Sequence, residues 1–136
     1  MKRLPVLLAS LALALAGCGA EGDSSVDRFQ GADREVAQKV EDLQEAGEGR
    51  NPEDICADIL ARTLVDQIEA AGASCAEELD KAIDDADDFD LDVLDVNVTG
   101  NEATVRVRRG DDGPTVTFEF TREGGQWRAT SLPGES

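Results

Sequence analysis

The residues of this chain with the most distinctive chemistry are its three cysteines, and the first of them follows an unusual leader. Lys2 and Arg3 give the N-terminus a positive head, and residues 4–16 form an almost unbroken apolar run. A membrane-spanning helix needs about 20 apolar residues, and this run is shorter. A positive head, a short apolar run and small residues before a cleavage point are typical of a secretory signal. The sequence therefore predicts an exported protein whose leader is removed.

Cys18 ends the stretch Leu15-Ala16-Gly17-Cys18, which resembles the lipobox of bacterial lipoproteins. The resemblance implies that the Cys18 thiol receives a diacylglycerol and that cleavage leaves Cys18 as the first residue. Acyl chains anchor a protein firmly, because each buried CH₂ contributes about 0.8 kcal/mol. The alternatives are an ordinary signal peptide with a chance cysteine or an uncut N-terminal anchor. We expect residues 1–17 to be a signal peptide and the protein to be lipid-anchored at the extracytoplasmic face of the cell membrane.

Cys56 and Cys75 are the two cysteines that remain after Cys18. Two cysteines in an exported chain usually oxidise to each other, and closing a loop of about 20 residues stabilises a domain by roughly 3 kcal/mol. Two free buried thiols or a metal pair are the alternatives. Zinc sites commonly use histidine, of which the chain has none. We therefore expect a disulfide, no metal and no cofactor.

An acidic stretch offers a different kind of chemistry. Asp88, Asp90 and Asp92 have the i, i+2, i+4 spacing of a calcium-binding loop. However, Val93 stands where the turn glycine belongs, and Thr99 stands where the bidentate glutamate belongs. We interpret the stretch as a solvated helix end and loop that binds cations weakly at most.

The chain is strongly acidic, with 30 acidic and 13 basic residues and a formal net charge of −17. Loss of the leader removes Lys2 and Arg3 and no acidic residue, so the mature chain is more acidic still. Without a basic stripe, such a chain is a poor partner for nucleic acid or for an anionic lipid surface. The length after Cys18 suits one small domain.

The elements that position these residues begin with a helical period. Apolar residues recur at i, i+4 and i+7 from Val36 to Leu43, and Gly47 is placed to end this helix. Ser74 and Glu77 have the spacing of a capping box. Further helical segments are expected at residues 51–60, 64–72 and 74–83.

Apolar and polar residues alternate from about residue 91 onward, which predicts strands. Leu94, Val96 and Val98 are expected to point inward on the first strand. Tight turns are expected at Gly100-Asn101 and Gly124-Gly125. Helices followed by hairpin-linked strands predict an α+β fold, with three to four N-terminal helices packed on one face of a four-stranded antiparallel sheet.

Five stretches carry a family resemblance, in this order: REVAQKVEDLQEAG, DICADIL, ASCAEEL, VNVTGNEATVRV and TVTFEFTREGGQWRATSL. Together they resemble the NTF2-like (cystatin-like cone) superfamily, and most closely its small secreted and lipidated members of actinobacterial type. The resemblance covers about residues 33–132 and implies a curved cone with a cavity, as well as pairing of Cys56 with Cys75. The segment before it is rich in Gly, Ser and acidic residues, so we expect a flexible tether at residues 18–32 and the domain at residues 33–133; an earlier start of the first helix, at Val26 and Phe29, is the alternative. No single activity follows, because the superfamily includes isomerases, dehydratases and members that only bind.

Isomerase or dehydratase chemistry needs a general base and a donor that stabilises an oxyanion. Family members with this chemistry typically pair Asp with Tyr, or His with Asp, and this chain contains neither Tyr nor His. Asp95 interrupts the apolar pattern of its strand and is the candidate base, although an acid near a strand start is usually solvated. We expect a protein that is not an enzyme.

Two further sets of residues are candidates for binding. The first set is Arg106, Arg108 and Arg128, which are expected on the polar face of the sheet together with Glu119. They form cross-strand charge pairs there, or alternatively a surface for a docking partner or a homodimer. The other set has inward parity and is expected in the core, with a pocket wall as the alternative: Phe118, Phe120 and Trp127.

These observations predict an anchored, non-catalytic module that binds an unknown protein or a small molecule. The alternatives are a carrier of a small apolar ligand in the cone cavity and a degenerate isomerase-like enzyme. An open cavity of a few hundred cubic ångströms would favour the carrier, whereas a filled interior would favour an interaction module.

Overall fold

The computed structural model describes residues 25–86 and 89–133 of the chain. Cys18 and the predicted signal peptide lie outside these residues. The described chain begins with helical elements: η1 (Ser25–Arg28), α1 (Gly31–Glu48), α2 (Pro52–Asp54), η2 (Ile55–Ile59), α3 (Arg62–Ala70) and α4 (Cys75–Asp85). Four strands follow: β1 (Leu91–Thr99), β2 (Glu102–Arg109), β3 (Thr115–Glu123) and β4 (Gln126–Ser131). Within this part of the chain, no helix has both the length and the apolar character to cross a membrane.

The strands form one antiparallel sheet in the order β1-β2-β3-β4, which confirms the predicted α+β class and the four-stranded sheet. Two-residue turns join β1 to β2 and β3 to β4, as the sequence predicted. Both turns need left-handed backbone, and glycine supplies it at Gly100 (φ 61°), Gly124 (φ 55°) and Gly125 (φ 80°).

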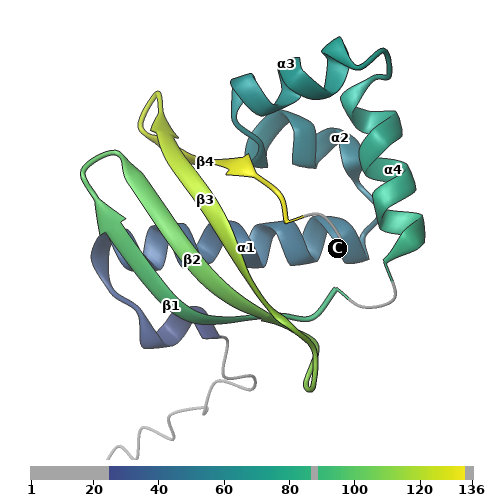
Figure 1. Ribbon diagram of the computed structural model, residues 1–136. Helices are drawn as coiled ribbons and strands as arrows, with labels where there is room; N and C mark the ends of the chain where they lie inside the picture. The colour runs from purple at the N-terminus through teal and green to yellow at the C-terminus, as the bar shows by residue number, and fades with distance from the viewer. Residues whose placement is uncertain (1–24, 87–88, 134–136) are drawn as a thin grey trace, which may run out of the picture.

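The helices cover one face of the sheet and one of its ends. Figure 1 shows α1 lying across one face of the sheet, while α2, α3 and α4 gather at one end, near β4. Helix α1 contacts both outer strands, β1 and β4. The core lies between α1 and the sheet, where Val36 and Val40 meet Val105, Val107 and Phe120, all at most 2 % exposed.

A β-bulge changes which residues of β1 enter the core. Val93 pairs with Val107, but the next pair is Asp95 with Arg106, so Leu94 is an extra residue. Val93 is therefore buried at 1 % exposure in the place where alternation predicted Leu94. A bulge reverses the parity of the residues before it, and simple alternation cannot reveal it.

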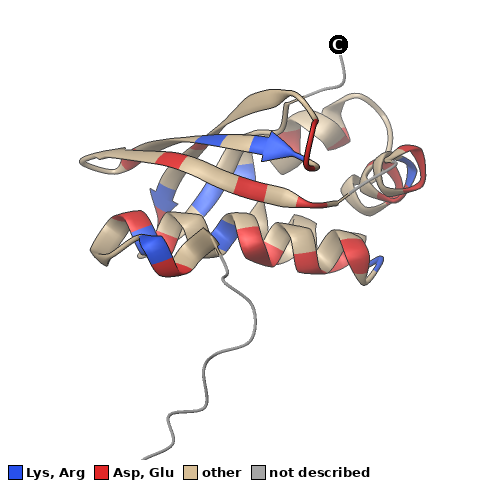
Figure 2. Ribbon diagram, turned by 90° about the horizontal axis from the view of Figure 1, so that it is seen from below, with Lys and Arg blue, Asp and Glu red and all other residues tan. Residues whose placement is uncertain are grey.

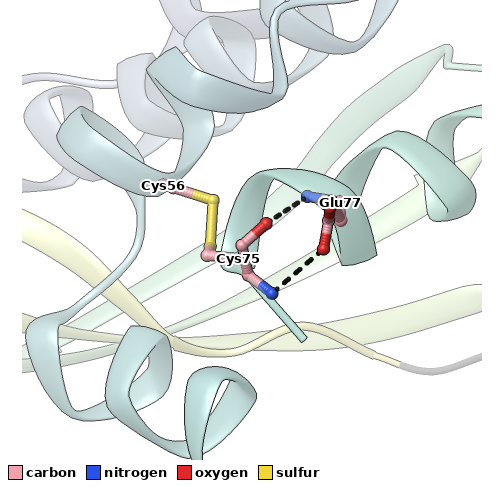
Figure 3. The surroundings of a disulfide bond; sticks show 4 residues. Cys56, Cys75 and Glu77 are labelled. Atoms are coloured by element: carbon pink, nitrogen blue, oxygen red, sulfur yellow. Dashed lines mark hydrogen bonds between the residues drawn. A yellow bond between two sulfur atoms is a disulfide. The ribbon is translucent and has the colours of Figure 1, made fainter. Parts of the chain in front are cut away.

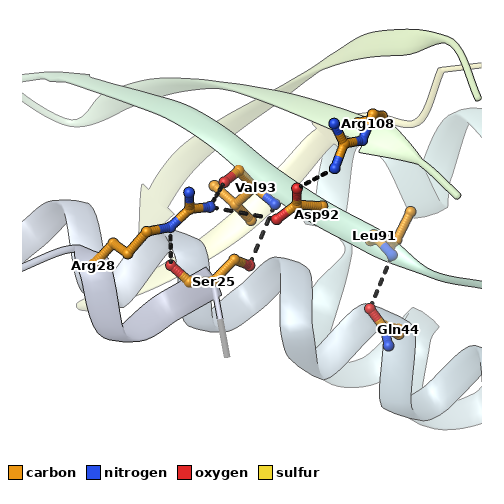
Figure 4. Close-up of polar contacts among 7 residues, drawn as sticks. All are labelled: Ser25, Arg28, Gln44, Leu91, Asp92, Val93 and Arg108. Carbon is orange, nitrogen blue, oxygen red and sulfur yellow. Dashed lines mark hydrogen bonds and ion pairs between the residues drawn. The ribbon is translucent and has the colours of Figure 1, made fainter. Parts of the chain in front are cut away.

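The N-terminal turn η1 belongs to the folded body and corrects the predicted tether. Val26 is 2 % exposed and joins the core. Ser25 Oγ accepts a hydrogen bond from the Val93 amide at 3.3 Å, and Arg28 donates to the Val93 carbonyl at 2.7 Å (Figure 4). The body therefore includes residues 25–32, which the sequence had assigned to a flexible tether. These contacts join residues that lie far apart in the sequence, and they supplement the burial of Val26.

A disulfide joins Cys56 of η2 to Cys75, the first residue of α4, with 6.1 Å between their Cα atoms. The prediction of this pair is confirmed. Beside it, Ser74 Oγ accepts from the Glu77 amide at 3.2 Å, and the Glu77 carboxylate accepts from the Ser74 amide at 3.4 Å (Figure 3). The predicted capping box is therefore present, and the disulfide and the cap together fix the start of α4.

Candidate functional site

An apolar groove lies between α4 and the nearby end of the sheet, and we call it the α4 groove. Its volume is about 400 Å³, and it is open to solvent. Its wall consists mainly of aliphatic and aromatic side chains, among them Leu79, Ile83, Phe89, Val116, Phe118 and Leu132. Among the described residues that line it, only Asp85 and Arg109 carry a charge. A groove of this kind can bind an apolar molecule by removing its surface from water.

Helix α4 supplies one wall of the groove. Leu79 and Ile83 are four residues apart, so they lie on one face of the helix. Their exposures are 7 % and 3 %, although both border the groove. The opposite wall includes Val116 and Phe118 of β3, whose spacing of two places them on one face of the sheet.

Phe89 packs directly against the backbone of α1 at Gly47. A Cβ atom on Gly47 would lie 2.5 Å from Phe89 Cδ1, which is too close for any other residue without movement of the ring. The sequence predicted that Gly47 ends the helix, but α1 continues to Glu48 with Gly49 as its cap. The role of Gly47 is therefore to admit the ring of Phe89, which forms part of the groove wall.

The three aromatic candidates occupy different places in the body. Phe118, at 5 % exposure, belongs both to the core and to the groove wall. Phe120 and Trp127 are buried in the core, and neither belongs to the groove wall. Trp127 Nε1 donates to Glu35 at 3.4 Å, and the Arg122 guanidinium lies 4.7 Å from the Trp127 ring centroid.

Two of the three candidate arginines form ion pairs with β1. Arg106 lies 2.6 Å from Asp95, and Arg108 lies 2.8 Å from Asp92 (Figure 4 shows the second pair). The partners are therefore acids of β1, and Glu119 takes neither role. The Asp95 side chain is 63 % exposed in this ion pair, so it does not face the groove as a base would.

Arg128 lies apart from the other two arginines. Its guanidinium donates to the carbonyl of Ala57 at 2.7 Å. In the strand register, Arg106 pairs with Thr117 and Arg128 pairs with Thr121, two positions that are about 13 Å apart along β3. The arginines therefore form no single basic patch. Figure 2 shows acidic residues spread along α1, with basic residues between them.

The acidic stretch does not assemble a cation site in the described part of the chain. Asp88 lies outside the described residues. The Asp92 carboxylate is engaged by Arg28 at 3.3 Å and by Arg108 at 2.8 Å. Among residues 25–86 and 89–133, no three His, Cys, Asp or Glu residues are close enough to hold a metal ion.

Three other hollows have polar walls. Their volumes are about 300, 490 and 290 Å³, and they are bordered by charged groups such as Asp92, Asp42 and Asp80. Near the third, Arg50 Nη1 lies 2.6 Å from Asp84, and this hydrogen bond and charge raise the pKa of the Arg50 guanidinium. Arginine is charged at physiological pH in any case, so this contact links α4 to the turn after α1 and adds no acid–base chemistry.

The groove wall contains residues that the sequence analysis did not single out for binding. Phe89 is an aromatic residue inside an acidic stretch, and an apolar side chain in such a stretch was the sequence signal that could have identified it.

A scan against protein-family models finds no match, and a search of the curated proteins finds none either.

Proposed function

We propose that this protein is a non-catalytic binding protein that takes a small apolar ligand into the α4 groove. It is held at the extracytoplasmic face of the cell membrane by a lipid on Cys18. The observation that carries this proposal is the open apolar groove of about 400 Å³. Small-molecule sites are typically concave, mostly apolar and about 300–1,000 Å³ in volume. This observation favours the carrier over a module that only docks other proteins.

The proposed family is the NTF2-like superfamily, with the sheet and helices as a cone around the groove. Two features support it: the order of helices before a four-stranded antiparallel sheet, and a groove between α4 and that sheet. The absence of an enzymatic role is also part of the proposal. Proton transfer needs an acid–base pair at the ligand, and the described wall offers only Asp85 and Arg109 as charged groups.

The binding test uses the full chain in phospholipid nanodiscs and the probe N-phenyl-1-naphthylamine, which fluoresces more strongly in apolar surroundings. We expect saturable fluorescence above that of protein-free nanodiscs. Ala82 lies in the groove wall and is exposed, so Ala82→Trp fills the groove without entering the core. This variant should weaken probe binding by about tenfold or more, which corresponds to about 1.4 kcal/mol.

The matched control is Ala70→Trp, which adds the same side chain to an exposed alanine at the end of α3, outside the groove. It should bind the probe as the wild type does. Wild-type fluorescence no higher than that of protein-free nanodiscs would contradict the proposal, as would equal loss in both variants.

A further inference from the structure

We infer that the ligand of the α4 groove is an acyl chain of a phospholipid in the membrane to which the protein is anchored. This inference rests on the proposed function and narrows its ligand class. It follows from the aliphatic wall of the groove and from the place where the chain leaves the folded body.

The wall selects for hydrocarbon rather than for a compact polar molecule. Ligand sites usually include a few polar groups that orient the ligand and provide specificity. Most of the described wall is aliphatic, and its charged residues are Asp85 and Arg109. Leu79, Ile83 and Leu132 offer surface without hydrogen-bonding groups. A flexible acyl chain needs no such groups, because its binding depends on the apolar area removed from water.

Ser25, the first described residue, lies near the end of the groove that Leu91 forms. The Val93 amide donates to Ser25 Oγ at 3.3 Å, which holds the first described residue against β1. Leu91 is two residues before Val93, so it lies about 7 Å away along the strand. Leu91 lines the α4 groove, and its amide donates to Gln44 of α1 at 2.9 Å (Figure 4). The groove wall and the N-terminal attachment therefore share one short stretch of β1.

The chain between the proposed anchor and Ser25 is short. Residues 18–24 are seven residues, which span at most about 25 Å when fully extended. Ser25 thus remains within about 25 Å of the lipid–water boundary, and a short linker of this kind gives a high effective concentration of acyl chains at the groove.

The test reconstitutes the full chain in phosphatidylethanolamine–phosphatidylglycerol vesicles. A trace of phosphatidylcholine with a diazirine on one acyl chain serves as the probe. After illumination, cross-linked residues are mapped by mass spectrometry. We expect cross-links in α4 and β3 at the groove, with the yield lowered by about tenfold or more in Ala82→Trp and unchanged in Ala70→Trp.

Several outcomes would overturn the inference. Cross-links confined to residues before Ser25, or equal yields in both variants, would show that the chain contacts lipid without using the groove. Labelling by a free diazirine fatty acid but not by the phospholipid would assign a soluble source. A diazirine fatty acid attached metabolically at Cys18 that labels the groove of its own chain, without phospholipid labelling, would assign the groove to the protein's own anchor.

The failure of this inference can be distinguished from failure of the proposed function. Binding of N-phenyl-1-naphthylamine without any acyl cross-link at the groove would retain an apolar-ligand site and reject the phospholipid. Absence of both signals would reject both.

Discussion

At the scale of single residues, Gly47 and Phe89 determine the shape of one wall of the groove. The ring of Phe89 occupies the space that a side chain at position 47 would fill. It is half-buried, packs against the core and borders the groove. The absence of a Cβ atom at position 47 therefore allows Phe89 to form part of this wall.

We predict that Gly47→Ala displaces Phe89 and destabilises the protein by about 1–3 kcal/mol, as overpacking of a core usually does. Thermal unfolding followed by circular dichroism measures the loss of stability, and the naphthylamine probe measures the change in the groove. Phe89→Leu removes the clash, so the double variant should lose less stability than the sum of the single variants. Strictly additive losses would show that the ring is not what resists the added methyl group.

At the scale of elements, α4 forms a groove wall, and a disulfide and a capping box fix the position of its first turn. The Cys56–Cys75 disulfide ties it to η2, and the capping box satisfies amides that the helix would otherwise leave unpaired. Ile55, the first residue of η2, also borders the groove. The disulfide therefore joins two elements that both contribute to the site.

We predict that the double substitution Cys56→Ser and Cys75→Ser lowers the free energy of unfolding by about 3 kcal/mol, because the unfolded chain regains the entropy of the opened loop. Urea unfolding measures this change. Reductant should move the wild-type midpoint toward that of the variant and leave the variant unchanged. We also expect weaker probe binding, since α4 is less firmly held. An unchanged midpoint would contradict a stabilising role for the bond.

At the scale of the whole molecule, the folded body begins no later than Ser25, so little chain is left between it and the proposed anchor. The contacts of Ser25 and Arg28 with β1 also cover part of an edge strand, whose backbone groups would otherwise be open to pairing with another chain. The proposed tethering and the protection of the edge strand would thus involve the same short segment.

We predict that Cys18→Ser abolishes labelling of the protein by an alkyne fatty acid fed to the producing cells. Without the thiol no diacylglycerol can be attached, so the chain should be released or retained in the membrane with its leader uncut. Fractionation and the mass of the product distinguish these two results. An unchanged membrane fraction of unchanged mass would count against lipidation at Cys18.

Local pattern was enough to predict the fold class, the two tight turns, the capping box and the cysteine pair. These features depend on residues close together in the chain, or on the chemistry of one residue type, and so they can be recognised in a single sequence. The capping box of Ser74 and Glu77 needs only two residues three positions apart. The burial of Phe118, Phe120 and Trp127 likewise follows from strand periodicity.

Only the tertiary structure decided which of these residues meet. It placed Leu94 in a bulge, brought Phe89 onto Gly47, drew Ser25 and Arg28 onto β1, and put Phe118 but not Phe120 beside the groove. Each outcome depends on contacts between segments far apart in the chain, and on how side-chain volumes fill a shared space. Periodicity shows which face of an element is buried. Only packing shows what that face contacts and where a groove remains.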